Sequence, residues 1–288
     1  MRTVLALACL AALGGCVIVA NPSGSSGKDF QVYTPFSGTT VDGNGVPARD
    51  TRSVASLPGL DVGGSMIVDV RVGAAPSLVV EGDSNLLSHV TTEARGGSLY
   101  IGTESRLRST TPLKITYTVP SLSHLHLGGS GHVTVRDLKG EPLSVRLGGS
   151  GVTRLSGEVA ELDAKVSGSG KIEAGELRAR SLNVEVSGSG GMVLGQVNGD
   201  NARVKITGSG TVQTKGVVRT LNVRVSGSGS ADLAGLSTDQ GELTSSGSGG
   251  ISATVRQSVF AQTSGSGPIR VYGQPAQRNT SGRGVQML

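Results

Sequence analysis

Short runs in which hydrophobic and polar residues alternate recur along residues 123–272. In residues 162–166 and again in 182–186 every second side chain is apolar, and a second, shorter alternation follows at residues 171–174. A hydrophobic period of two predicts β-strands that bury one face. The chain therefore reads as a series of paired short strands, each pair separated by a gap of four residues.

The gaps carry a motif of glycine and serine, such as GGSG at 128–131 and SGSG at 167–170. Eight copies occur, and their first residues are 18 to 20 positions apart. Runs of Gly and Ser are typical of flexible linkers, but a linker has no physical reason to keep a period. The copies begin at Gly128, Gly148, Ser167, Ser187, Thr207, Ser226, Ser246 and Ser264.

One such unit cannot bury its apolar face alone, but stacked units can, if equivalent strands pair in parallel. We therefore expect an all-β fold, a right-handed single-stranded parallel β-helix (a solenoid) of about eight coils, one for each motif. We expect right-handed winding because crossover connections between parallel strands are almost always right-handed. Glycine is expected to supply positive φ angles at each bend, and serine to hydrogen-bond backbone groups there.

The motifs have other interpretations. Glycine-rich turns also form backbone nests that bind anions, and this alternative stays open beside the architectural one. Calcium-binding β-rolls need an aspartate in a nine-residue repeat, whereas the residue after each motif here is His, Val, Lys, Gly, Thr, Ser, Gly or Pro. We therefore expect no calcium ladder.

Residues 1–15 are expected to be a lipoprotein signal peptide. They contain one arginine and an apolar run that is too short for a helix that stays in a membrane. Residues 13–16, LGGC, resemble a bacterial lipobox, so Cys16 is the predicted lipidation site and the expected contact with a membrane. A plain secreted protein is the alternative. Cys9 would leave with the signal peptide, so we expect no disulfide.

The rest of the chain divides by composition and periodicity. Residues 16–53 are rich in Gly, Ser, Thr, Asn and Pro and are expected to form a flexible tether. Residues 54–122 alternate well without glycine corners and are expected to form an N-terminal β cap, followed by the repeat coils at 123–272 and a C-terminal cap at 273–288.

Residues 54–288 as a whole resemble the bacterial head GIN domain family, described as "putative auto-transporter adhesins". The resemblance rests on the lipobox, the tether, the segment 57–103 that begins LPGLDVGGSMIVDV, and the serial SGSG units in the expected order. It implies a right-handed β-helix in the cell envelope. It implies little chemistry, because the adhesin description rests on fold-level analogy.

Composition and charge exclude one class of partner. The chain has 46 glycines, no Trp, 3 Phe and 4 Tyr, so small aliphatic residues must form the core. Its formal net charge of +5 is too mild for nucleic acid binding, which usually needs a dense basic patch.

The outward positions of the strands before each motif are the main candidate site. They include a basic stripe that could meet an anionic glycan, lipopolysaccharide or an envelope protein. Phe260 is the only aromatic residue of the repeats expected to face outward, which argues against aromatic platforms for neutral glycans. The stripe consists of Arg146, Lys165, Arg203, Lys205 and Arg224.

Two further clusters were weighed as chemical centres. Asp163 and Glu185 lie on adjacent coils at a separation that suits a glycosidase, but neighbouring cations would hold both pKa values down and leave no proton donor. His124, His126 and His132 could hold zinc or copper only if another donor joined them. We therefore expect no catalytic residues, no metal and no cofactor.

Three hypotheses on function follow. The first is a non-enzymatic lipoprotein of the cell envelope, on either face of the outer membrane, whose rigid β-helix presents a surface for adhesion or envelope assembly. The residue after Cys16 is Val17 and not the aspartate that retains lipoproteins at the inner membrane. The alternatives are a periplasmic scaffold or accessory protein that binds an anionic glycan, a lipid or a partner protein, and a polysaccharide-active enzyme.

Overall fold

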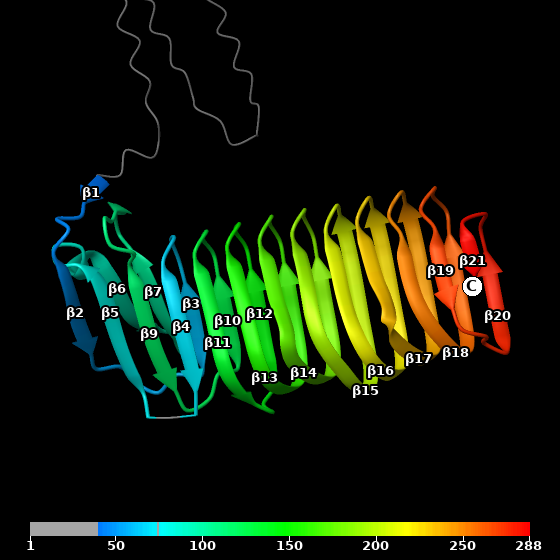
Figure 1. The fold of residues 1–288 in the computed structure, drawn as a ribbon, viewed down its shortest axis with the longest axis horizontal. Helices are drawn as coiled ribbons and strands as arrows, with labels where there is room; N and C mark the ends of the chain where they lie inside the picture. Colours follow the sequence, from blue (N-terminus) through cyan, green and yellow to red (C-terminus); the bar gives the residue numbers. More distant parts are fainter. Residues whose placement is uncertain (1–39, 74) are drawn as a thin grey trace, which may run out of the picture.

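The computed structural model describes residues 40–73 and 75–288, which form one elongated stack of strands (Figure 1). The expected signal peptide, Cys16 and the first part of the expected tether lie outside these residues. Strands cross the long axis of the stack, and the expected parallel β-solenoid of about eight turns is confirmed.

The strands fall into two groups along the stack. The N-terminal group is β1 (Thr40–Asp42), β2 (Pro47–Arg52), β3 (Gly59–Val62), β4 (Ile67–Val72), β5 (Ser77–Asp83), the 3-10 turn η1 (Leu87–His89), β6 (Val90–Arg95), β7 (Ser98–Thr103), β8 (Arg106–Arg108) and β9 (Lys114–Val119). The repeat group is β10 (His124–Leu127), β11 (His132–Lys139), β12 (Leu143–Leu147), β13 (Val152–Val166), β14 (Lys171–Val186), β15 (Gly191–Gly208), β16 (Thr211–Gly227), β17 (Ser230–Gly247), β18 (Ile251–Thr263), β19 (Ile269–Tyr272), β20 (Gln277–Ser281) and β21 (Val285–Met287).

Successive coils of the repeat pair in parallel at the spacing of the motifs. Leu162 lies opposite Leu182, and Leu182 opposite Ala202, so one coil is 20 residues long at these steps. The inward residues, such as Val184 and Val204, are fully buried, and the polar residues between them face outward. The alternation seen in the sequence is therefore the alternation between the core and the surface of the solenoid.

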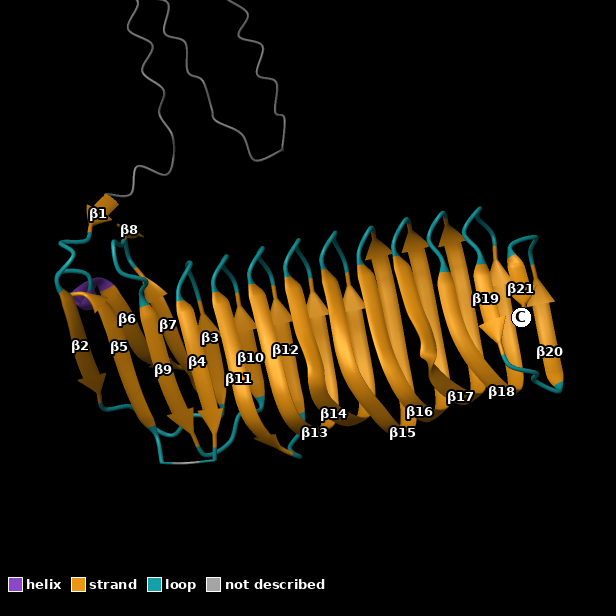
Figure 2. Ribbon diagram, in the orientation of Figure 1, coloured by secondary structure: helices purple, strands orange, loops and turns teal. Residues whose placement is uncertain are grey.

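The Ser-Gly motifs form the row of loops along one edge of the solenoid (Figure 2). Each corner bonds directly to the corner before it: the Gly170 N–H donates to the Gly149 carbonyl at 3.1 Å, and the Gly190 N–H to the Gly168 carbonyl at 3.0 Å. A Cβ placed on Gly170 would lie 2.6 Å from the Gly151 carbonyl oxygen. The glycines are therefore required because the backbones of adjacent coils touch at the corner.

The expected reason for the glycines was wrong for most of the corners. Among the glycines of the eight motifs, only Gly208 and Gly227 have a positive φ, at 129° and 121°. Nor do the middle serines of the motifs, such as Ser169, bond the backbone through their hydroxyls anywhere in the described part of the chain; these residues are exposed. The close approach of neighbouring carbonyls, rather than an unusual dihedral angle, selects glycine.

The segment expected to be a cap contains coils of its own. β3 and β4 pair in parallel with β10 and β11, and they are joined by residues 63–66, GGSM. The Ser130 N–H donates to the Gly64 carbonyl at 3.0 Å, and the His132 N–H to the Met66 carbonyl at 2.9 Å. The expectation that residues 54–122 lack a glycine corner was therefore wrong, because Met66 replaces the last glycine and disguises the motif.

The order of these coils in space differs from their order in the chain. β7 and β9 pair in parallel with the other edges of β3 and β4. Residues 59–72 are therefore inserted between residues 98–119 and residues 124–139. We call residues 59–72 the inserted coil.

Three antiparallel strands close the N-terminal end of the stack. β5 pairs with β9, β2 pairs with β5, and β6 pairs with β7, so the parallel ladder ends there. The expected end of the tether at residue 53 was wrong, because β1 and β2 are regular strands and β1 pairs with β8.

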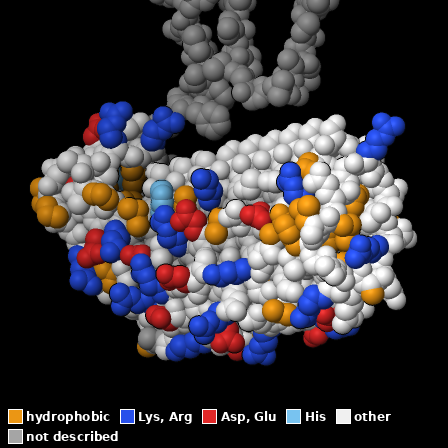
Figure 3. Space-filling model, turned by 45° about the vertical axis from the view of Figure 1, so that its right-hand side comes forward, with side chains coloured by type: hydrophobic (Ala, Val, Ile, Leu, Met, Phe, Trp, Pro, Cys, Tyr) orange, Lys and Arg blue, Asp and Glu red, His pale blue; other side chains and the backbone are white. Residues whose placement is uncertain are grey.

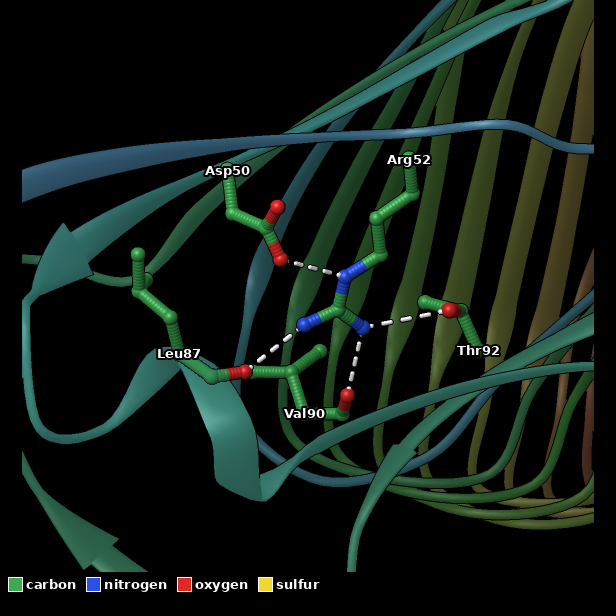
Figure 4. A network of polar contacts seen from close by, with 5 residues as sticks. All are labelled: Asp50, Arg52, Leu87, Val90 and Thr92. Atoms are coloured by element: carbon green, nitrogen blue, oxygen red, sulfur yellow. Dashed lines mark hydrogen bonds and ion pairs between the residues drawn. The ribbon is translucent and has the colours of Figure 1, made fainter.

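Arg52 fixes β2 to the cap (Figure 4). Its guanidinium donates to the carbonyl oxygens of Val90, at 2.6 Å, and Leu87, at 2.7 Å, and to the Asp50 carboxylate at 2.8 Å. The Arg52 side chain is 19% exposed, so these charge-assisted bonds are largely shielded from water. They explain why the folded part begins earlier than composition suggests.

Asp83 fixes the loop that joins β8 and β9. Burial raises the pKa of Asp83, but hydrogen bonds from the Thr110 N–H, at 2.8 Å, and the hydroxyls of Thr111 and Ser109 outweigh it, and the net pKa lies below the ordinary value. A lowered folded-state pKa stabilises the fold above the ordinary aspartate value, and this contribution is lost as pH falls through the folded-state value.

The expected C-terminal cap continues the solenoid. β20 pairs in parallel with β18, and β21 with β19. They flank residues 281–284, SGRG, which take the place of a corner. This end of the stack is therefore closed by one more coil.

Gly170→Ala tests the packing of the corners. The added methyl would meet the Gly151 carbonyl and Leu147 Cδ2, at 2.6 and 2.7 Å, so we expect the free energy of unfolding to fall by about 1 to 3 kcal/mol. Ser169→Ala in the same corner should change it by less than about 0.5 kcal/mol, because that side chain is exposed. Urea unfolding followed by circular dichroism measures both, and equal effects would contradict the packing argument.

Arg52→Met tests the N-terminal cap. Two backbone carbonyls lose their charged donor, and we expect a loss of about 1 to 3 kcal/mol, with faster amide exchange in β2 than in the wild type. Arg49→Met on the same strand is the control, because Arg49 is exposed and its contact with Glu81 is 4.0 Å long. Rapid exchange in both variants, or in neither, would show that Arg52 does not hold the strand.

Candidate functional site

The outward residues before the corners form two columns along one face. Column one is the series in register with Lys165, and column two is the series in register with Asp163, two positions earlier in each coil. Column one is His126, Arg146, Lys165, Glu185, Lys205, Arg224, Thr244 and Gln262. Column two is His124, Ser144, Asp163, Asn183, Arg203, Asn222, Glu242, Phe260 and Asn279.

The five residues of the basic stripe lie on this face. Arg146, Lys165, Lys205 and Arg224 are members of column one, and Arg203 belongs to column two. The period of the repeat is sufficient to bring them together, because one residue per coil recurs at the same place on the surface.

Carboxylates interrupt the stripe. Glu185 lies between two lysines, 3.2 Å from Lys165 Nζ and 2.9 Å from Lys205 Nζ. Glu242 lies 3.5 Å from the Arg224 guanidinium. Basic and acidic side chains are accordingly interspersed on the face shown in Figure 3. This surface therefore carries charges of both signs rather than a continuous basic strip.

Glu185 remains ionised in this setting. The hydrogen bond from Lys205 lowers the pKa of Glu185, and the contact with Lys165 lowers it further, while partial burial opposes both. The carboxylate therefore stays charged at pH values where an ordinary glutamate begins to protonate. It neutralises part of the stripe throughout the neutral range, and it cannot act there as a proton donor.

Arg146 and Arg203 differ from the other cations of the stripe. Arg146 donates to the Ser144 hydroxyl at 3.3 Å. No carboxylate within the described residues forms an ion pair with either arginine. These two positions are the ones where the stripe keeps an uncompensated positive charge.

The other members of the two clusters weighed as chemical centres, Asp163 and the histidines, make few contacts. Asp163 accepts a long hydrogen bond of 3.5 Å from Asn183. His124 Nδ1 lies 2.8 Å from the Ser123 hydroxyl, and His126 Nδ1 lies 3.9 Å from Asp61. In residues 40–73 and 75–288, no group of three or more His, Cys, Asp or Glu side chains is arranged to hold a metal ion.

A groove beside column two was not foreseen from the sequence. Its volume is about 820 Å³, and it crosses the coils from β13 to β20. It is lined by column two from Asn183 to Asn279 and by the residue two positions earlier in each coil, which we call column three. Column three is Glu161, Ser181, Asn201, Thr220, Gln240, Ser258 and Gln277.

The sequence contained one signal for the groove. Column three carries an amide or a hydroxyl in six of its seven members, at the same offset from each corner. Polar outward residues are usual on any solenoid, so this regularity does not by itself indicate a hollow. The hollow itself appears only in the structure, where the side chains of successive coils line it.

Comparison with known proteins gives a family match and several structural matches. The family model described as "Putative auto-transporter adhesin, head GIN domain" matches residues 57–194 and 174–275. None of the curated proteins matches the chain. Among the residues that the structure describes, no helix is long and apolar enough to cross a membrane.

Three solved structures share the fold. A "putative adhesin" from Parabacteroides distasonis matches with a TM-score of 0.67 at 22% identity, over 87% of this chain and 100% of the other. A "putative adhesin" from Parabacteroides merdae matches with a TM-score of 0.63 at 18% identity, over 86% and 99%. A "putative lipid binding protein" from P. distasonis matches with a TM-score of 0.61 at 24% identity, over 87% and 100%.

Glu185→Gln tests whether the stripe is masked by its own carboxylate. The change releases two lysines, and we expect the affinity for heparin at low salt to rise about two- to fivefold, since an exposed charge pair contributes about 0.2 to 1 kcal/mol. Glu158→Gln is the control, because it makes the same change of charge outside columns one and two. Equal gains in both variants, measured by titration calorimetry, would mean that net charge alone governs the binding.

Proposed function

The chain belongs to the head GIN domain family, described as "putative auto-transporter adhesin", and on that basis we propose that it is a non-enzymatic cell-envelope lipoprotein that presents its solenoid as a rigid surface for adhesion or envelope assembly. The observation that carries the proposal is the unbroken register of columns one and two. From β12 to β18 every coil offers one residue of each column at the same place. Such a surface is long, regular and fixed by the backbone ladder, as a docking surface requires.

The positions of the two ends of the stack support the same role. The described chain starts at the capped end of the stack, and its C-terminus lies at the opposite end (Figure 1). If Cys16 carries the lipid, the cap is the end nearer the anchor in the chain and the last coils are farther from it. The 24 residues from Cys16 to Thr40 set an upper limit of roughly 80 Å on the distance between the lipid and the cap.

An outer-membrane location follows from the same proposal. The proposed anchor is Cys16, at the end of the lipobox-like residues 13–16, and several acyl chains together hold a protein firmly at a bilayer. We propose the outer membrane because Val17 follows the cysteine. The partners are then the membrane itself, through the lipid, and a ligand or protein that meets the solenoid.

A second candidate is a periplasmic accessory protein that binds an anionic glycan, a lipid or a partner protein. It is favoured by the placement of five cations on one face, with Arg146 and Arg203 free of carboxylate partners among the described residues. One structure with the same fold is described as a "putative lipid binding protein". Binding of this kind would weaken as salt rises, because the cations are exposed.

Cys16→Ser tests the anchor. We expect the variant to move from the membrane fraction to the soluble fraction and to lose labelling by an alkyne fatty acid, because the thiol that accepts the lipid is gone. Cys9→Ser is the matched control, because Cys9 lies in the proposed signal peptide, which would be removed before the cysteine at position 16. A Cys16→Ser chain that still takes up the label would contradict the lipidation site.

Surface biotinylation of intact cells completes this test. Labelling of the wild-type chain supports presentation to the exterior. A chain that is labelled only after the outer membrane is opened would contradict adhesion and favour the periplasmic candidate.

A further inference from the structure

The groove beside column two has the chemistry of a binding site for a hydroxyl-rich ligand. The side chains of Asn201, Gln240, Ser258 and Asn279 line it and form no hydrogen bond with any other described residue. An amide offers two donors and an acceptor, and a hydroxyl offers one donor and two acceptor positions. Sugar hydroxyls need the same mixture of donors and acceptors.

Phe260 adds an apolar platform to these polar groups. Phe260 is 39% exposed, and its neighbours in column two are both polar, Glu242 on one side and Asn279 on the other. A rigid aromatic ring at the surface offers contact area at a low cost in conformational entropy. Its position among unpartnered amides distinguishes it from exposed apolar residues outside the groove, such as Val193.

The charges that line the groove are balanced. Its lining contains two cations, Arg203 and Arg278, and two carboxylates, Glu161 and Glu242, which gives two charges of each sign. Glu242 also accepts a hydrogen bond from Asn222 and pairs with Arg224. The formal charges that line the groove therefore sum to zero and give an anionic polymer no net attraction there; Arg203 is the one lining residue that also belongs to the basic stripe.

The dimensions of the groove suit an extended chain. Column three runs from Ser181 to Gln277 over six consecutive coils. Adjacent strands lie about 4.8 Å apart, so these coils span roughly 24 Å. A polymer with a repeat close to this spacing would meet an equivalent polar group on each coil, and extended polysaccharides have units of about this length.

We propose that this groove binds an extended, uncharged polysaccharide, with Phe260 stacking on one sugar and the amides of Asn201, Gln240 and Asn279 bonding hydroxyls along the chain. The proposal rests on the proposed adhesive function and names its class of ligand. The scarcity of aromatic residues argued against neutral glycans from the sequence. The structure supplies what that argument lacked, a hollow in which one aromatic ring lies beside a row of free amides.

The experiment measures binding of the purified full-length chain to an array of uncharged hexose and N-acetylhexosamine oligomers of increasing length, with heparin on the same array. We expect affinity to rise with length up to about five or six sugars, the span of the groove at about 4.8 Å per coil. It should be nearly unchanged between low and high salt, because no net charge is involved. Phe260→Ala should weaken binding about tenfold, and Asn201→Ala with Gln240→Ala by a similar factor.

Val193→Ala is the matched control. Val193 is also an exposed apolar residue on a solenoid strand, but it lies outside the groove, so affinity should stay within about twofold. Phe260→Tyr should keep most of the binding, which separates loss of the ring from loss of fold.

Failure of this proposal is distinguishable from failure of the adhesive function. If no uncharged oligomer binds, or if the Phe260 and amide variants bind as the wild type does, the groove proposal is overturned. Binding of heparin alone, lost at high salt, also overturns it and assigns recognition to the basic stripe. Surface presentation and anchoring through Cys16 are measured separately and stand or fall on their own results.

Discussion

The structure depends on the direct contact between the backbones of successive Ser-Gly corners. At each corner the N–H groups of one coil bond the carbonyls of the coil before it, and the position of a Cβ is occupied by a neighbouring carbonyl oxygen. This contact sets the register of every strand that enters or leaves a corner. The columns on the outer face, and with them the candidate site, follow from that register.

Much of the fold could be predicted because its signals are local and repeated. Alternation fixed which residues face the core, and the spacing of the motifs gave the length of a coil. The role of glycine was assigned to dihedral angles, since a sequence does not show how closely two coils approach. The corner at residues 63–66 was missed because Met66 breaks the pattern, and the wide loop at 104–113 beside it leaves room for a side chain there.

The candidate site was predictable only in part, for a related reason. The five cations could be placed on one face from the period of the repeat alone, because residues at the same number of positions before each corner lie at the same place on the surface. Which of them are neutralised depends on contacts across coils, such as those of Glu185 with Lys165 and Lys205. The groove is a property of the three-dimensional surface, and the spacing of residues along the chain does not show it.

The inserted coil constrains the order in which the molecule can be built. Residues 59–72 precede both of their neighbours in the chain, and both of their hydrogen-bonding edges are completed by strands made later, at 98–119 and 124–139. The unit in which both edges of the inserted coil are paired therefore spans residues 59–139, about eighty residues. Beyond Lys139 each new coil can pair with the completed coil before it. Folding therefore changes from a slow, non-local nucleation to the addition of one coil at a time.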